Sequence, residues 1–157
     1  MKSKKIIISD SILDSFENDK KYPPIPDIVY HGQPPLYKNG KEIEPEIITK
    51  FDQNKKRYLE EKHVGFYFTD KKHIAQEYAG SGNLYTCKLH IKNPYYFIWI
   101  YRYNNKGLIN NPAFITYAER DILFKNGFDS VLQLDMVNNF ENIVVFDPDK
   151  IQILKIN

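Results

Sequence analysis

The residues that could bind a ligand or take part in catalysis lie in three short segments: "VYHG" at 29–32, "GFYFTDKKHIAQEYA" at 65–79 and "ENIVVFDP" at 141–148. His31 can donate and accept hydrogen bonds. Tyr67 and Tyr78 each offer a flat apolar ring with a polar tip, which favours stacking on a planar ligand. The sequence contains no P-loop, no glycine-rich dinucleotide fingerprint, no His-Glu-x-x-His and no Gly-x-Ser-x-Gly. The functional signal is therefore the presence of all three segments in this order, since each alone is typical of ordinary structure.

The elements that position these residues can be predicted from the pattern around them. A short strand is predicted at 27–31, ending in the His-Gly pair, and a second, buried strand at 64–68. A helix follows the second strand, capped by Thr69 or Asp70 and continuing to about residue 79, where "GSGN" ends it. The two tyrosines therefore flank one strand–helix corner.

The rest of the chain favours an α+β domain. Further strands are predicted at 84–91, 128–134, 143–147 and 151–156, and helices at 10–19 and 114–126. Strands outnumber helices and do not alternate regularly with them, which favours mainly antiparallel sheets. The apolar run 95–101 is too short to assign by periodicity. We expect a single domain over 1–157, with an N-terminal helical segment at 1–27 and a long variable connection at 33–62.

Composition narrows the class of protein. A chain of 157 residues with 42% hydrophobic content suits one globular domain. The net charge of +2 is mixed along the chain, so nucleic acid is not indicated as a partner, although charge does not exclude it. Cys87 is the single cysteine, and the histidines have no partners at ligand spacing, so we expect no disulfide and no metal. No apolar run approaches the ~20 residues of a membrane span. We therefore expect a cytoplasmic monomer without a membrane partner.

Taken in order, the three segments resemble the catalytic core of ADP-ribosyltransferases of the His-Tyr-Glu group, which includes diphtheria-type toxins and poly(ADP-ribose) polymerases. That pattern is a strand ending in His-Gly, then Gly-x-Tyr-Phe with an acidic turn and a Tyr-bearing helix, then Glu-Tyr-Val-Val-Phe-x-Pro. The resemblance spans residues 28–156. Within this group, the sequence is similar in particular to small transferase domains of phage and mobile-element proteins. It implies two packed, mainly antiparallel sheets with a few flanking helices.

The resemblance also implies a substrate and roles for the residues. The co-substrate would be NAD, which loses nicotinamide through an oxocarbenium-like transition state. His31 would bind the adenosine ribose, and Gly32 would let the backbone approach the nicotinamide amide. Tyr67 and Tyr78 would clamp the nicotinamide ring, and Phe68 belongs to the same NAD-binding set.

The third catalytic position departs from the family pattern. The family has a Glu that fixes the reacting ribose and stabilises the cation, but the register of "IVVFD" puts Asn142 there. Glu141 immediately precedes it, and neighbours in a regular strand point to opposite faces. A one-residue bulge, or a strand that starts after Asn142, would let Glu141 enter the site. Asn142 is favoured by register and Glu141 by chemistry, so both are candidates.

The function expected from these residues is mono-ADP-ribosylation of a macromolecular target, most simply a protein. An effector of phage or bacterial origin, acting in or delivered into a host cell, fits this activity. The alternative is a catalytically inactive module with a transferase-like fold that grips a partner, which the missing Glu would explain. A third candidate, an RNA 2′-phosphotransferase, ranks lowest because it would need further His and Arg residues near "YHG".

Overall fold

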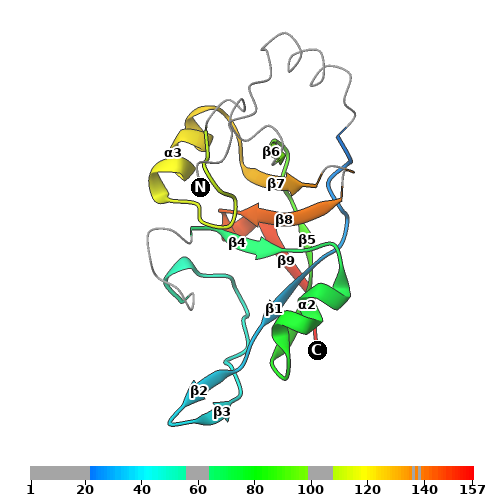
Figure 1. The fold of residues 1–157 in the computed structure, drawn as a ribbon, viewed down its shortest axis with the longest axis vertical. Coiled ribbons are helices and arrows are strands. Elements are labelled where there is room, and N and C mark those ends of the chain that lie inside the picture. The colour runs from blue at the N-terminus through cyan, green and yellow to red at the C-terminus, as the bar shows by residue number, and fades with distance from the viewer. Residues whose placement is uncertain (1–21, 56–63, 99–107, 136, 138) are drawn as a thin grey trace, which may run out of the picture.

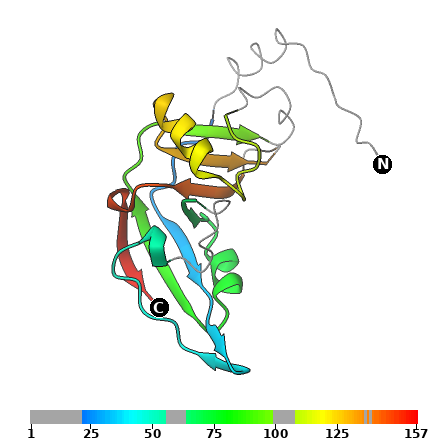
Figure 2. The same ribbon diagram turned by 90° about the vertical axis from the view of Figure 1, so that its left-hand side faces the viewer.

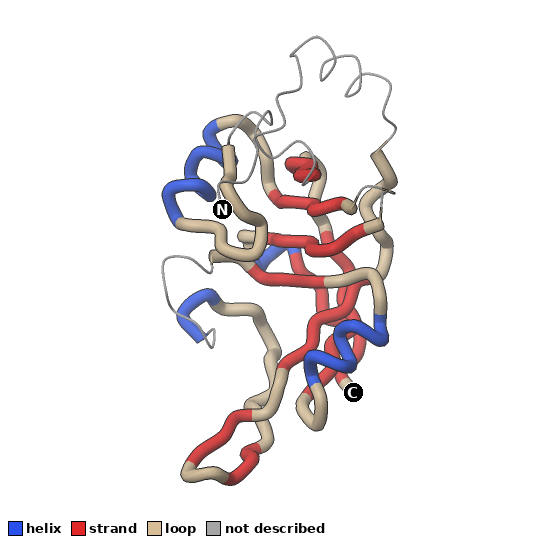
Figure 3. Tube along the Cα trace, viewed as in Figure 1, coloured by secondary structure: helices blue, strands red, loops and turns tan. Residues whose placement is uncertain are grey.

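The computed structural model of the protein describes residues 22–55, 64–98, 108–135, 137 and 139–157. The helix predicted at 10–19 and the last part of the run 95–101 lie outside these residues. Strands make up most of the regular structure (Figure 3). Among the described residues, no helix is long and apolar enough to cross a bilayer.

Two sheets form the body of the molecule, and their strands run at a steep angle to each other (Figures 1 and 2). The three-stranded sheet has the order β1 (Val29–Gln33), β5 (Asn83–Leu89) and β9 (Ile151–Ile156). The four-stranded sheet has the order β4 (Phe66–Phe68), β8 (Phe140–Val145), β7 (Ser130–Leu134) and β6 (Pro94–Ile98). All pairings are antiparallel except that of β6 with β7. The predicted α+β class with mainly antiparallel sheets is confirmed.

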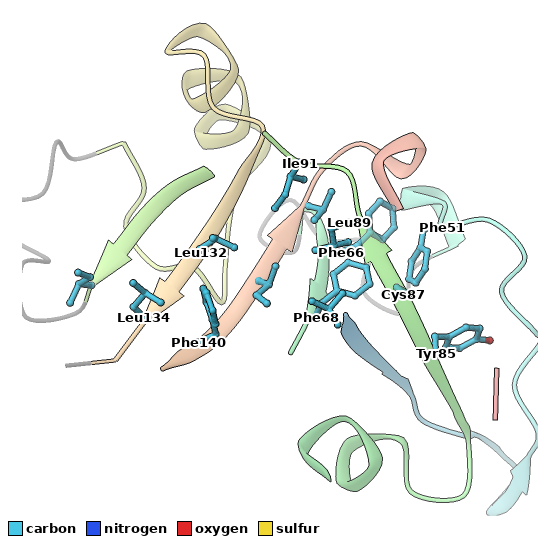
Figure 4. Packing of buried hydrophobic residues seen from close by; sticks show 14 residues of the cluster. Phe51, Phe66, Phe68, Tyr85, Cys87, Leu89, Ile91, Leu132, Leu134 and Phe140 are labelled. Atoms are coloured by element: carbon cyan, nitrogen blue, oxygen red, sulfur yellow. The ribbon is translucent and has the colours of Figure 1, made fainter. Parts of the chain in front are cut away.

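The two sheets meet where β1 lies beside the end of β4. Tyr30 and Thr69 exchange two backbone hydrogen bonds here, with N···O distances of 2.7 and 3.0 Å. A core cluster with residues from both sheets packs next to this junction (Figure 4): Val29, Phe51, Phe66, Phe68, Tyr85, Cys87, Leu89, Ile91, Ile98, Leu132, Leu134, Phe140, Ile143 and Val145. The sheets are therefore joined by backbone bonds at one edge and by apolar packing beyond it.

A second core lies on the other face of the four-stranded sheet, under α3 (Tyr117–Lys125). The alternation of β8 divides its residues between the cores: Ile143 belongs to the first and Val144 to the second. Helix α3 begins at a capping box in which Thr116 and Glu119 bond each other's backbone N–H groups. This cap starts the helix three residues later than the prediction of 114.

Helix α2 (Lys72–Ala79) packs along β1. The prediction that Thr69 or Asp70 caps it is wrong, because the N-cap is Lys71, which makes no side-chain capping bond. The Thr69 hydroxyl instead accepts a bond from the Lys71 N–H at 3.1 Å, which closes the turn before the helix. The strand–helix corner is thus formed as expected, although the helix begins later.

The connection after β1 carries a hairpin of β2 (Leu36–Lys38) and β3 (Lys41–Ile43), followed by the short 3₁₀ helix η1 (Gln53–Lys55). The Asn39-Gly40 turn has φ values of 54° and 73°, as a tight hairpin turn requires. The hairpin projects from one end of the molecule (Figure 1). A second 3₁₀ helix, η3 (Pro148–Lys150), leads into β9.

Candidate active site

A cavity of about 640 Å³ opens beside the junction of the two sheets. This volume is within the range of sites that hold small molecules and cofactors. Every residue predicted for the site lines it: His31, Gly32, Tyr67, Phe68, Tyr78, Glu141 and Asn142. A further wall comes from residues 45–52, between the hairpin and η1. The structure thus brings together side chains from three segments that are far apart in the sequence.

His31 is held in one orientation by its neighbours. Its Nδ1 lies 2.7 Å from the Tyr67 carbonyl oxygen. Since a carbonyl oxygen only accepts hydrogen bonds, Nδ1 carries a proton and donates it. The imidazole also meets Phe51 edge-on, at 5.1 Å between ring centroids. The strand that carries His31 runs over Val29–Gln33, two residues later at each end than the predicted 27–31, so it does not end at the His-Gly pair.

Gly32 lies where helix α2 crosses closest to β1. A Cβ atom at this position would stand 2.3 Å from the Ala75 carbonyl oxygen and 3.0 Å from the Ala79 backbone nitrogen. The absence of a side chain therefore lets the helix approach the strand, and the placement of Tyr78 on that helix depends on it. Gly32 also lines the cavity, where its backbone is within the reach of a ligand.

Substitution Gly32→Ala should destabilise the protein, because the clash is with helix backbone that cannot rotate away. We expect a loss of about 1–3 kcal/mol in the free energy of unfolding, measured by urea denaturation. Gly80→Ala is the matched control: its Cβ would meet nothing within 4 Å, so only the cost of its φ of +56° remains. A Gly32→Ala variant as stable as the unaltered protein would contradict the close packing at Gly32.

Tyr67 reaches the cavity from β4, and its hydroxyl donates a hydrogen bond to the Pro112 carbonyl oxygen at 3.0 Å. Burial is the main cause that raises the pKa of Tyr67 to about 12, and the negative charge of Glu119 adds to it. The phenol therefore stays neutral at physiological pH. Tyr67 can act through its ring and hydroxyl but is a poor general base.

The raised pKa predicts a loss of stability in alkali. An unfolded Tyr titrates near 10.0 and the folded Tyr67 near about 12, so its contribution is complete below pH 10 and is lost as the pH rises through 12. The buried Cys87 thiol acts in the same direction, since burial raises its pKa from 9.0 to about 12. In Tyr67→Phe/Cys87→Ala, the urea midpoint should fall less between pH 9 and pH 11 than in the unaltered protein. Parallel curves would contradict this origin of the pH dependence.

Tyr78 lines the cavity from α2 and is 61% exposed. A ring that borders the cavity and is also this exposed lies at its mouth. Ile74, one turn earlier on the helix, lines the same side. Tyr67 and Tyr78 therefore face the cavity from two different elements, as the strand–helix corner predicted.

Glu141 and Asn142 both border the cavity because β8 contains a bulge. Gln133 of β7 pairs with Asn142, and Leu134 pairs with Phe140, so Glu141 is the extra residue. A bulge removes the strict alternation of a strand and lets two neighbours turn toward the same side. The one-residue bulge that would admit Glu141 is present.

Gln133 was not predicted as a site residue. Its side-chain Nε2 donates to Glu141 Oε2 at 2.6 Å, and its Oε1 accepts from Asn142 Nδ2 at 2.7 Å. Gln133 is 3% exposed in a strand whose other residues are buried. A glutamine inside the apolar run "SVLQL" was the available signal, since a buried amide needs partners.

The contribution of residues 45–52 to the cavity wall is also not predicted from the sequence. This segment is tied to the three-stranded sheet through Tyr85, whose hydroxyl donates to Gln33 Oε1 at 2.6 Å and accepts from the Ile48 N–H at 2.8 Å. Gln33 Nε2 in turn donates to the Glu46 carbonyl oxygen at 2.8 Å. These partners are distant in sequence, so only the fold reveals them.

Within the described parts of the chain, no group of three or more His, Cys, Asp or Glu residues could hold a metal ion. Among the residues predicted for the site, the chemistry available at the cavity comes from an imidazole, two phenol rings, a carboxylate and an amide, and the other polar lining residues include Tyr30, Glu46, Lys50 and Asp52. These groups can bind a planar ring and hydroxyl groups and can stabilise a positive charge.

Comparison with models of protein families identifies the family of the chain. A family model described as "ADP-Ribosyltransferase in polyvalent proteins" matches residues 25–156. The matched range contains every residue that lines the cavity. No match was found among curated proteins.

Proposed function

Because the chain belongs to the family of ADP-ribosyltransferases in polyvalent proteins, we propose that it is a mono-ADP-ribosyltransferase of the His-Tyr-Glu type that modifies a protein. ADP-ribosyltransferases use NAD as their substrate. The observation that supports this proposal most strongly is that the imidazole, the two phenol rings and the carboxylate line one cavity. That cavity has a volume suited to a cofactor-sized ligand.

In the proposed complex, the dinucleotide lies along the junction of the sheets. His31 binds the adenosine ribose, and the Gly32 backbone binds the nicotinamide amide. Tyr67 and Tyr78 hold the nicotinamide ring from the strand and helix sides, with Phe68 beneath them. The residues fit this assignment because the bond to the Tyr67 carbonyl oxygen holds the His31 ring in one orientation at the cavity, and aromatic faces attract a pyridinium cation.

The reaction breaks the bond between ribose C1′ and the nicotinamide nitrogen. The electron pair leaves with nicotinamide, which becomes neutral, and positive charge develops on the ribose. Glu141 stabilises this charge, as a carboxylate does in other glycosyl transfers. A nucleophilic atom of the acceptor then bonds to C1′, and the acceptor releases one proton to solvent.

Single transfer is favoured over chain extension. Extension requires a base that activates a hydroxyl of the growing ADP-ribose chain. The resemblance puts Asn142 in the position of the family Glu, and an amide cannot serve as that base. Glu141 is assigned here to the charge on the ribose and not to the acceptor. A protein side chain that is already a good nucleophile needs no such base.

The hairpin β2–β3 supports a protein acceptor. All six strand residues are exposed, and among them Leu36, Tyr37 and Ile43 are large and hydrophobic. Leu36 also lines the cavity, so a partner bound to the hairpin would stand at its mouth. Lys38 pairs with Lys41, and like charges facing each other are unfavourable unless a partner offsets them. The strands also carry Glu42, so the hairpin offers apolar groups with two lysines and one carboxylate, which fits a protein surface of mixed charge.

Charge reversal tests the role of the hairpin. Lys38→Glu/Lys41→Glu should lower label transfer into protein several-fold and leave nicotinamide release to water unchanged, because the cavity is untouched. Lys88→Glu/Lys155→Glu is the matched control, since these lysines are exposed on β5 and β9 away from the cavity. Equal losses in both variants would show a general charge effect instead.

The proposed activity is tested with NAD labelled in its adenylate part. We expect nicotinamide release, measured by chromatography, and label in a protein fraction of a host lysate, both abolished by His31→Ala. Binding of NAD without release or transfer would overturn the enzyme proposal and favour the inactive binding module, which Asn142 at the register position supports. The effector role and a cytoplasmic place of action rest on the resemblance to small transferase domains of phage and mobile elements.

A further inference from the structure

Gln133 is a polar residue in an apolar place. It lies in β7 between Leu132 and Leu134, both fully buried, and is itself 3% exposed. Burying an amide without partners is costly, and an apolar residue would pack here without that cost. Both ends of the Gln133 amide are bonded, and both partners line the cavity. The amide therefore connects the interior of the sheet with the site.

The bulge in β8 is what makes these two contacts possible together. In a regular strand, one of two neighbouring side chains would point away from Gln133. Here Gln133 is opposite Asn142, and the extra residue Glu141 turns back to reach the same side chain. The distances of 2.6 and 2.7 Å are short for amide hydrogen bonds, so all three side chains are closely held.

Glu141 fixes which groups donate and which accept in the hydrogen bonds that join Glu141, Gln133 and Asn142. An ionised carboxylate only accepts hydrogen bonds, so Gln133 must turn its NH₂ group toward it. The Gln133 oxygen then faces Asn142, which must also use its NH₂ group. Asn142 consequently offers its carbonyl oxygen to a ligand, and Glu141 offers carboxylate oxygen. Two acceptors beside each other suit two neighbouring hydroxyl groups, as on a ribose.

We propose that Gln133 is a positioning residue that makes the Glu141–Asn142 pair the binding site for the cis-diol of the reacting ribose, with Glu141 carrying the charge. Gln133 does not touch the ribose. It holds the bulged Glu141 in place and orients the Asn142 amide. The diol assignment rests on the proposed function, whereas the link between Gln133 and Glu141 can be tested without turnover.

Gln133→Met tests the contact, because Met has a similar length but no amide. Glu141 is exposed and Asn142 half-buried, so water can replace the lost bonds and the fold should persist. We expect kcat for nicotinamide release to fall about 10- to 100-fold, as for a misplaced catalytic group, with the KM for NAD changed less than threefold. Gln152→Met is the matched control, since Gln152 also bonds one side chain, His90, but lies away from the cavity.

Gln133→Glu separates the two contacts. The new carboxylate still accepts from Asn142, but it repels Glu141, and two carboxylates this close hold a proton between them. The acidic limb of the pH profile of nicotinamide release should therefore move to higher pH. A residue that only fills space would not move that limb. An unshifted limb, or unchanged kcat in Gln133→Met, overturns the positioning role.

Nitrogen-15 NMR gives a readout that does not need enzyme activity. The Gln133 side-chain amide signal, identified by its loss in Gln133→Met, should move in Glu141→Ala, because the amide loses its hydrogen bond to the carboxylate. If this change occurs and no nicotinamide is released by any form, the link stands and the proposed function fails. If the Gln133 signal is the same with and without the Glu141 carboxylate, the proposal about Gln133 fails.

Discussion

Replacing Glu141 by Gln should lower the rate of nicotinamide release about 100- to 1,000-fold, the cost of removing one preorganised group that stabilises a transition-state charge. The change keeps the shape of the side chain and leaves an oxygen that can still accept from Gln133 Nε2. Only the negative charge facing the developing cation is lost. Binding of NAD, measured by calorimetry, should change little because the charge develops only in the transition state.

Two further variants show whether the effect belongs to Glu141. Asn142→Ala should reduce the rate much less, because it removes one hydroxyl contact and no charge. Glu46→Gln is the matched control: Glu46 lines the same cavity, and its bond to Gln33 uses the backbone oxygen, so the wall is kept. If Glu141→Gln releases nicotinamide at the normal rate while Asn142→Ala does not, the bulged carboxylate is not the catalytic group.

The strand–helix corner and the positions of most strands along the chain follow from local sequence. The apolar run at 64–68 and the alternation at 84–91 indicate strands that face the core, and the glycines after residue 79 indicate where the helix stops. These signals are local, and they place Tyr67 and Tyr78 on separate elements around one cavity. The family resemblance then indicates the function of this arrangement, which periodicity alone does not indicate.

The choice between Glu141 and Asn142 could not be made from the sequence, because a bulge is a relation between two strands. The register shift opposite Gln133 turns both residues to one side, and the pattern of "FENIVV" by itself is compatible with a regular strand. The wall at residues 45–52 is hidden for the same reason. It is fixed by hydrogen bonds from Gln33 and Tyr85, whose partners are 13 and 37 residues away.

Replacing Tyr78 by Ala should lower kcat/KM for NAD about 5- to 150-fold, since stacking of an aromatic ring on a base is worth about 1–3 kcal/mol by alanine substitution. Tyr78 is 61% exposed, so little packing is lost, and we expect the free energy of unfolding to stay within about 0.5 kcal/mol. Tyr78→Phe keeps the ring and should retain most of the activity. Steady-state kinetics of nicotinamide release and urea denaturation measure the two effects separately.

The neighbouring Glu77→Ala is the matched control for the helix. Glu77 is exposed on the same turn of α2 but does not line the cavity, so its removal tests whether any change in the helix surface affects turnover. We expect normal kinetics for this variant. If Tyr78→Phe fails as completely as Tyr78→Ala, the hydroxyl and not the ring face is what the substrate uses. If Tyr78→Ala and Glu77→Ala both behave normally, the nicotinamide ring is not held from the side of α2.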